Sequence, residues 1–195
     1  PDMRVRLRAQ VELSRRPDGF AVFQTGLQSR KPMERLHSLW GLGVIARRGI
    51  VPAPLADGSA AKPDTSQMKL AANLLMDRLK DPDAEIRTQA LKMLADVKGL
   101  PMSNLGIDAL LQDESARVVF YTALLVARQG DKSFVPQILR VLKANQDKDP
   151  FLRHAGSYAL SQLLKEQEFN ALRAETDPSV RLAMVVALRR MKSPL

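Results

Sequence analysis

Cysteine is absent from all 195 residues of the chain. Disulfide bonds, thiolate metal sites, c-type haem attachment and a cysteine nucleophile are therefore excluded within this sequence. The sequence also lacks an apolar run of the roughly 18 residues that indicate a membrane-spanning helix. The fold must therefore rest on the packing of ordinary apolar side chains.

Aromatic residues are scarce, at 5% of the chain, although 45% of the residues are hydrophobic. Alanine and leucine supply most of that apolar content. Both favour helices, whereas strands are enriched in aromatic and β-branched residues. The composition therefore predicts an all-α protein, with enough apolar residues for one sizeable core or a stack of small ones.

Acidic residues are outnumbered by basic ones, 21 against 30, which gives a net charge of +9 and an isoelectric point near 10.2. Such an excess suggests a nucleic acid or another anionic surface as a partner. That suggestion has to be weighed against where the charges lie along the chain.

A pattern recurs six times, for example as DAEIRTQALKML at 83–94 and DPSVRLAMVVAL at 177–188. Each copy contains an arginine: Arg6, Arg35, Arg87, Arg117, Arg153 and Arg181. Seven residues later each has a leucine: Leu13, Leu42, Leu94, Leu124, Leu160 and Leu188. Four residues earlier stand Asp2, Asp83, Asp113, Asp149 and Asp177, with Lys31 in the second copy. Six leucines at one offset indicate an internal repeat.

The spacing within the pattern has a physical interpretation. An aspartate followed by proline or a small residue is typical of a helix N-cap, where its carboxylate accepts hydrogen bonds from free N–H groups. Apolar residues one before, three after and seven after the arginine share one face of a helix. We expect each arginine to lie at the edge of that face. There its guanidinium would reach the aspartate of its own or the adjacent unit, forming a structural ladder.

Shorter apolar segments, such as 20–27, 68–79 and 134–142, lie between these helices at helical spacing. Each unit is therefore predicted to be a helix pair whose second helix carries the arginine. The arginines are 28 to 36 residues apart, except for 52 between Arg35 and Arg87. The sequence thus predicts a right-handed α-α superhelix of about six hairpins, one domain over residues 1–195. A loop inserted at about 50–67 is either a flexible surface loop or a binding or domain-docking loop.

The Asp-x-x-aliphatic-Arg motif with downstream Ala and Leu resembles the second helix of a HEAT repeat. The order of RLHSLWGLGVIARRG, LLMDRLKDPDAEIRTQALKMLAD, NQDKDPFLRHAGSYAL and VRLAMVVALRRM is similar to the HEAT segment of large proteins of Planctomycetes and Verrucomicrobia. In that family the segment lies between a dehydrogenase-like β-propeller and a cytochrome-c-type haem domain. The resemblance implies a fragment of an exported, redox-associated protein, periplasmic or extracytoplasmic. The haem motif Cys-x-x-Cys-His is absent here, so only a helical spacer or docking platform carries over.

Residues that could carry chemistry are few. The stretch Gly41–Ala46 fits the Gly-x-Gly-x-x-Ala dinucleotide fingerprint, but no strand precedes it, so close helix packing is the better interpretation. His37 and His154 lie in different repeats without metal-ligand spacing. The acidic residues are mostly the N-cap aspartates. We therefore predict no catalytic residue, no cofactor and no metal.

Basic residues cluster near the predicted C-terminal ends of the second helices, at Arg47, Arg48, Arg189 and Arg190 among others. Cations there complement the helix dipole, but they could also form a basic rim that meets phosphates or an acidic protein.

Aromatic residues also fall on the repeat columns that should approach the concave surface. Trp40 and Tyr158 lie five residues after their arginines, and His154 lies one residue after Arg153. Trp40 and Tyr158 either contact a partner or tilt into the core, and the sequence leaves both readings open.

These observations favour a non-enzymatic scaffold that binds a protein or a neighbouring domain, with no membrane insertion and no small-molecule substrate evident. Two alternatives stay open. One is a nucleic-acid-binding HEAT-like protein of the alkylpurine DNA glycosylase type, suggested by the positive charge. The other is a HEAT-type lyase that attaches bilin chromophores.

Overall fold

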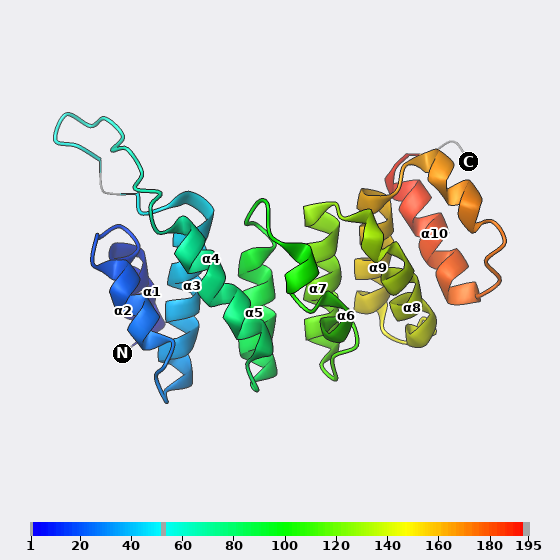
Figure 1. Cartoon of the computed structure of the whole chain (residues 1–195), viewed down its shortest axis with the longest axis horizontal. Helices are drawn as coiled ribbons and strands as arrows, with labels where there is room; N and C mark the ends of the chain where they lie inside the picture. The colour runs from blue at the N-terminus through cyan, green and yellow to red at the C-terminus, as the bar shows by residue number, and fades with distance from the viewer. Residues whose placement is uncertain (1, 52–53, 193–195) are drawn as a thin grey trace. The chain divides into compact units, whose positions relative to one another are not determined.

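The computed structural model describes residues 2–51 and 54–192 (Figure 1). Within these ranges the chain folds into α-helices and short 3-10 helices, and the only β-type pairing is a bridge between Ile50 and Asp64. The predicted all-α class is confirmed. No described helix has the length and apolar character needed to cross a membrane.

The helices group into two compact units, Pro1–Lys98 and Gly99–Leu195. Each unit contains helix pairs of the kind that the sequence predicts. A single domain over residues 1–195 stays a prediction.

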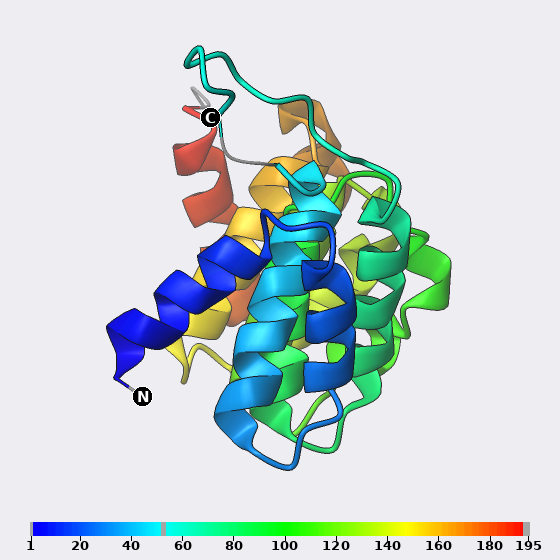
Figure 2. The same cartoon turned by 90° about the vertical axis from the view of Figure 1, so that its left-hand side faces the viewer.

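The first unit contains two helix pairs and one additional helix. The pairs are α2 (Gly19–Gly26) with α3 (Pro32–Arg48), and α4 (Met68–Asp77) with α5 (Ala84–Leu94); a 3-10 turn, η1 (Arg78–Lys80), extends α4. Helix α1 (Met3–Leu13) packs on α3 and is inclined to both α2 and α3 (Figure 2). Within the described residues, α1 is a second helix that lacks a first helix of its own.

The core of the first unit lies between first and second helices. Its fully buried side chains include Leu39, Leu42, Ile45, Leu75, Leu91 and Leu94. Two glycines of α3 let its neighbours approach closely: a Cβ on Gly41 would lie 2.3 Å from the ring of Phe23, and one on Gly43 would lie 2.6 Å from the sulfur of Met93. The packing interpretation of Gly41–Ala46 is thereby confirmed.

The predicted insertion follows α3 as an irregular segment. Ile50 and Asp64 exchange backbone hydrogen bonds of 2.8 Å in both directions, which closes the base of the loop. Gly49 has a φ of 74°, and a Cβ there would meet the Asp64 carbonyl oxygen at 2.3 Å. Only glycine therefore fits this close approach without strain. Residues 52 and 53 of the predicted 50–67 loop lie outside the described residues.

The second unit contains three further second helices, α7 (Ala116–Gln129), α9 (Pro150–Leu163) and α10 (Pro178–Arg190). Their first elements are shorter or less regular. They are η2 (Met102–Asn104) with α6 (Ile107–Leu110), η3 (Lys132–Phe134) with α8 (Val135–Asn145), and η4 (Glu166–Leu172). Leu125, Ile138, Leu142 and Leu160 are among its most deeply buried residues. Gly156 lets α9 approach α8, because a Cβ there would lie 2.6 Å from the Leu142 side chain.

The repeat register at 113–124 differs from the prediction by two residues. We expected Asp113 to cap the helix, but α7 has Ser115 as its N-cap, and the Asp113 carboxylate accepts from the Ser115 N–H at 2.9 Å. Val119, not Arg117, therefore stands four residues after the cap. Leu124 is accordingly only half-buried, whereas Val126 is fully buried. This copy therefore has the same Asp–Arg–Leu spacing as the other copies, but its three residues lie two positions earlier relative to the start of the helix.

Candidate interaction surface

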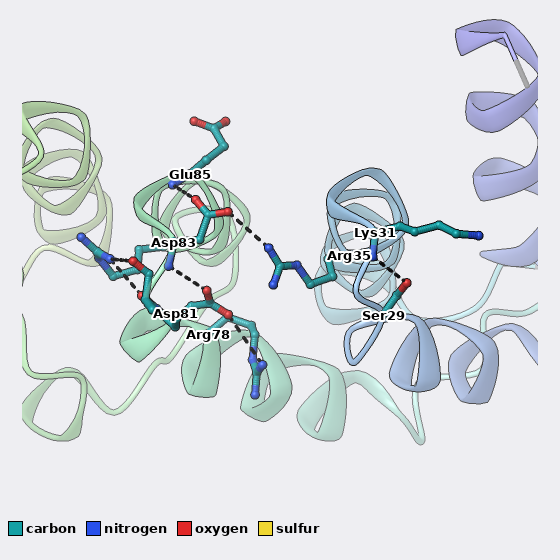
Figure 3. Close-up of polar contacts among 9 residues, drawn as sticks. Ser29, Lys31, Arg35, Arg78, Asp81, Asp83 and Glu85 are labelled. Carbon is teal, nitrogen blue, oxygen red and sulfur yellow. Dashed lines mark hydrogen bonds and ion pairs between the residues drawn. The ribbon is translucent and has the colours of Figure 1, made fainter.

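Four of the repeat aspartates cap helices. The carboxylates of Asp2, Asp83, Asp149 and Asp177 accept hydrogen bonds from the first free N–H groups of α1, α5, α9 and α10. Two of these carboxylates also bind an arginine with their second oxygen. Asp2 accepts from Arg4 at 3.4 Å, and Asp83 accepts from Arg35 at 3.3 Å (Figure 3).

The Arg35–Asp83 pair joins consecutive second helices of the first unit, as the ladder hypothesis expects. Arg87 makes a different contact: it is 9% exposed, and its Nη1 donates to the carbonyl oxygens of Asp81 and Pro82 at 2.9 and 3.0 Å. Arg153 likewise reaches back six residues, to the carboxylate of Asp147. These arginines hold the turn that precedes their own helix.

The remaining ladder residues occupy other environments. Arg6 is half-buried on α1, and Arg117 lines a groove on α7. Arg181 is exposed on α10, and no ion pair joins it to a carboxylate in the described part of the chain. The uniform ladder stays a proposal, and the contacts that we observe are concentrated on turns and caps.

Trp40 is half-buried and contacts side chains of α3 and α5 in the first unit. Its Nε1 donates to Gln89 Oε1 of α5 at 2.9 Å, and its ring lies edge-on to His37 with the centroids 5.0 Å apart. His37 Nδ1 lies 2.8 Å from Gln10 Oε1 of α1. Burial, together with the nearby positive charge of Arg6, lowers the pKa of His37. This network connects three consecutive second helices.

Tyr158 is also half-buried, but its contact is with a charge. The guanidinium carbon of Arg190 on α10 lies 4.7 Å from the centre of the Tyr158 ring. The structure thus brings two of the predicted partner-contact residues together in a cation–π contact. His154 lies one turn before Tyr158 on α9 and is exposed.

The predicted basic positions lie at helix ends. Arg47 and Arg48 occupy the last turn of α3, and Arg189 and Arg190 the last turn of α10. Arg47 donates to the Gly43 carbonyl at 3.0 Å and to Asp96 at 3.1 Å. Arg48 and Arg189 are exposed. In the second unit, Arg190 therefore lies beside Tyr158 of α9.

A groove that the sequence did not reveal lies between α7 and the start of α9. It encloses about 360 Å³ and is lined by Ala116, Arg117, Phe120, Tyr121, Asp149 and Phe151. Phe151 is 70% exposed, the highest value among the exposed large apolar residues. We call this site the α7–α9 groove. The sequence pattern did not predict this groove because it placed the start of α7 two residues too early. With Ser115 as the N-cap, Phe120 takes the repeat position that Leu36 has in α3 and His154 has in α9.

The described residues offer little for catalysis. They contain no cluster of three or more His, Cys, Asp or Glu side chains that could hold a metal ion. His37 and His154 lie in different units. Most of the carboxylates that accept hydrogen bonds do so at helix caps, turns or ion pairs.

A comparison with solved structures supports the fold. A designed armadillo repeat protein, solved in complex with the peptide (KR)4, matches 94% of this chain and 90% of its own with a TM-score of 0.50 and 14% sequence identity. At this identity the likeness shows an all-α, solenoid-like fold and nothing about the ligand. No protein-family model matches the chain. No curated protein sequence matches it significantly either.

Proposed function

We propose that this chain is a non-enzymatic scaffold whose second helices bind an extended segment of a partner protein or neighbouring domain. The observation that carries the proposal is the exposed Phe151 ring, which lines the α7–α9 groove together with the half-buried rings of Phe120 and Tyr121. Soluble proteins rarely leave large apolar side chains together on a surface unless that surface binds something. Aromatic residues are also the preferred anchors of protein interfaces.

The shape of the α7–α9 groove suits a side chain instead of a whole molecule. A volume of about 360 Å³ is near the lower end of ligand sites, and its walls are mostly apolar. Phe120 and Tyr121, whose rings meet edge-on with centroids 5.0 Å apart, form one wall, and Phe151 forms the other. An aromatic or large aliphatic side chain of the partner would fill this space.

The charges around the groove favour acidic neighbours for that side chain. Arg117 lines the groove, and Arg190 lies over the ring of Tyr158 on α9. The acidic residue of the lining, Asp149, lies at the N-terminus of α9, where the N–H groups of Phe151 and Leu152 donate to its Oδ1 and the helix dipole offsets part of its charge. We therefore propose a partner segment with an apolar anchor flanked by Asp or Glu. This is the opposite charge to the (KR)4 peptide of the designed armadillo protein.

The test uses the full chain and a fluorescein-labelled peptide of 12 residues, with two Phe at its centre and Glu elsewhere. Anisotropy titration should show saturable binding, which Phe151→Ala weakens about tenfold. Leu70→Ala is the matched control, because Leu70 is exposed to 54% on α4 in the other unit. Equal binding by Phe151→Ala, or by a peptide with Lys in place of Glu, would contradict the proposal.

Nucleic acid is the rival ligand, since the net charge of +9 would attract phosphates. Single-stranded DNA of 12 nucleotides, titrated in the same assay, distinguishes the two. Tighter binding of the DNA than of the acidic peptide, with a steep loss on adding salt, would favour the nucleic-acid function instead.

The resemblance to the HEAT segment of Planctomycetes and Verrucomicrobia proteins supports a further proposal. In it, the scaffold is one module of an exported, redox-associated protein. The complete reading frame tests it: a Cys-x-x-Cys-His motif or a β-propeller repeat beside this segment is expected, and neither should be found if the proposal is wrong.

A further inference from the structure

The segment inserted after α3 has a hydrogen-bonded turn at its tip. The Leu55 N–H donates to the Ser59 carbonyl at 2.9 Å, and the Gly58 N–H donates to the Leu55 carbonyl at 2.9 Å. Gly58 has a φ of 80°. A tight turn followed by a glycine in the left-handed conformation is typical of a short hairpin loop. Together with the bridge that closes its base, this turn holds the segment at both ends. We call residues 54–64 the arm.

The tip of the arm presents one large apolar side chain and one carboxylate. Leu55 is 56% exposed, and every residue from 54 to 60 is exposed. The Asp57 carboxylate accepts from the Ser59 N–H at 2.8 Å and from the Ser59 hydroxyl at 2.6 Å, both at Oδ1. These hydrogen bonds lower the pKa of Asp57, so its carboxylate stays ionised. Figures 1 and 2 show the arm reaching beyond the helices of the first unit.

The α7–α9 groove of the second unit suits what the arm presents. As proposed above, it accepts a large aliphatic or aromatic side chain with an acidic neighbour. Its charged lining residues are Arg117 and Asp149, and Asp149 already accepts N–H groups of α9 at Oδ1. The arm carries Asp57, Lys62 and Asp64. Asp57 is nearest to Leu55 in sequence, and an arginine has five N–H donors with which to bind a carboxylate.

We infer that the arm of one copy of this chain docks in the α7–α9 groove of a second copy. Leu55 enters the space between the three aromatic rings of the groove, and Asp57 faces Arg117. Because the turn at the tip is formed before docking, few further residues have to be ordered. This inference rests on the proposed function of the groove and adds a ligand from the chain itself, which competes with the partner segment.

The arm and the groove are different surfaces of the chain, so the contact is not between identical patches. Copies therefore associate head to tail, or exchange arms within a closed pair. Sedimentation equilibrium of the full chain, from micromolar to near-millimolar concentration, measures the association. Salt of about 0.15 M screens the repulsion between copies that each carry a net charge of +9. The mean mass should rise with concentration above the 21.7 kDa of one chain.

Two variants test the two sides of the contact. Leu55→Asp places a charge among the aromatic rings, and Phe151→Ala removes one wall of the groove, so each should weaken self-association about tenfold. Leu70→Asp is the matched control and leaves association unchanged, because Leu70 is 54% exposed on α4. All three side chains are exposed, so each variant should keep the melting temperature of the parent chain.

Mixing the variants tests whether the two sides meet. Leu55→Asp retains an intact groove and Phe151→Ala retains an intact arm, so an equimolar mixture should form pairs and stop at two chains. A chain that carries both substitutions should pair with neither variant. General damage to the fold, or association through another surface, does not produce this pattern.

The inference is overturned if the parent chain stays monomeric at every concentration, or if Leu55→Asp associates as well as the parent does. The Phe–Glu peptide, titrated into dilute chain, separates this inference from the proposed function. Peptide binding that depends on Phe151, without self-association, overturns only the second copy as occupant. A monomeric chain that binds the peptide more tightly after Leu55→Asp also overturns it, because the arm then occupies its own groove. If the peptide does not bind either, the proposed function fails as well.

Discussion

Five residues after the repeat arginine, the first unit has Trp40 and the second unit has Tyr158, and the two aromatic side chains make different contacts. In the first unit, Trp40 donates to Gln89, His37 meets Gln10, and Arg47 pairs with Asp96, so the polar and aromatic groups of one helix are held by the next. In the second unit, Phe151 is largely exposed, and the half-buried Tyr158 ring lies under the guanidinium of Arg190. The comparison teaches that an aromatic side chain at one repeat position can be held by a hydrogen bond to the next second helix, as at Trp40, or by a cation–π contact, as at Tyr158.

The largest expected loss of stability comes from a pair of leucine variants that test where the repeat motif lies on the helices of the second unit. Leu160→Ala removes a side chain that is 0% exposed and should lower the free energy of unfolding by about 2–5 kcal/mol. Leu124→Ala, at the same offset from its arginine, should cost much less because Leu124 is half-buried. Urea unfolding followed by circular dichroism measures both. Equal losses would mean that the two-residue register difference in α7 is wrong.

Helix caps provide a second contrast. Asp83→Ala removes both the hydrogen bond to the Glu85 N–H and the ion pair with Arg35. Loss of the cap alone costs about 1 kcal/mol. Asp177→Ala removes only a cap and should cost less than Asp83→Ala, and Arg35→Ala in the Asp83→Ala background should add nothing further. Unfolding free energies of the single and double variants measure the coupling, and full additivity would argue against the inter-helix pair.

Substitutions of Trp40 and Tyr158 test the difference between the two units directly. Trp40→Phe keeps the apolar ring but removes the donor to Gln89, and should lower stability by about 1 kcal/mol. Tyr158→Phe keeps the ring under Arg190 and should leave stability nearly unchanged. Thermal melts of the two variants make the comparison. A larger loss of stability in Tyr158→Phe would show that the Tyr158 hydroxyl group contributes more to stability than the Trp40 hydrogen bond does.

The smallest expected effect is a pH dependence in the first unit. The folded state lowers the pKa of His37 below its ordinary value, because burial and Arg6 both disfavour the charged imidazole. The unfolded chain therefore binds the proton more readily, and stability falls as the pH drops through the ordinary histidine pKa of about 6.5. His37→Gln should flatten that slope relative to the parent chain. Chemical unfolding at several pH values between roughly 5 and 8 compares them.

Much of the fold could be predicted because it depends on local chemistry. The helix-capping role of Asp83, Asp149 and Asp177 follows from the preference of a carboxylate for free N–H groups, which neighbours in sequence supply. The buried leucines at 42, 94 and 160 follow from helical periodicity. The same reasoning failed at Asp113 and Arg117. There the motif matches, but the helix begins two residues later than the motif predicts, so the residues occupy different positions on the helix.

The sequence by itself determined the all-α class, the pairing of first and second helices, the inserted loop and the basic helix ends, since each depends on residues close together in the chain. Only the tertiary structure decided which side chains face one another. Arg153 binds Asp147, Trp40 donates to Gln89, and Phe120, Tyr121 and Phe151 line a common groove. These contacts depend on the rotation and crossing of the helices, which are set by the packing of residues far apart in sequence. The proposed binding surface at the α7–α9 groove arises from that packing.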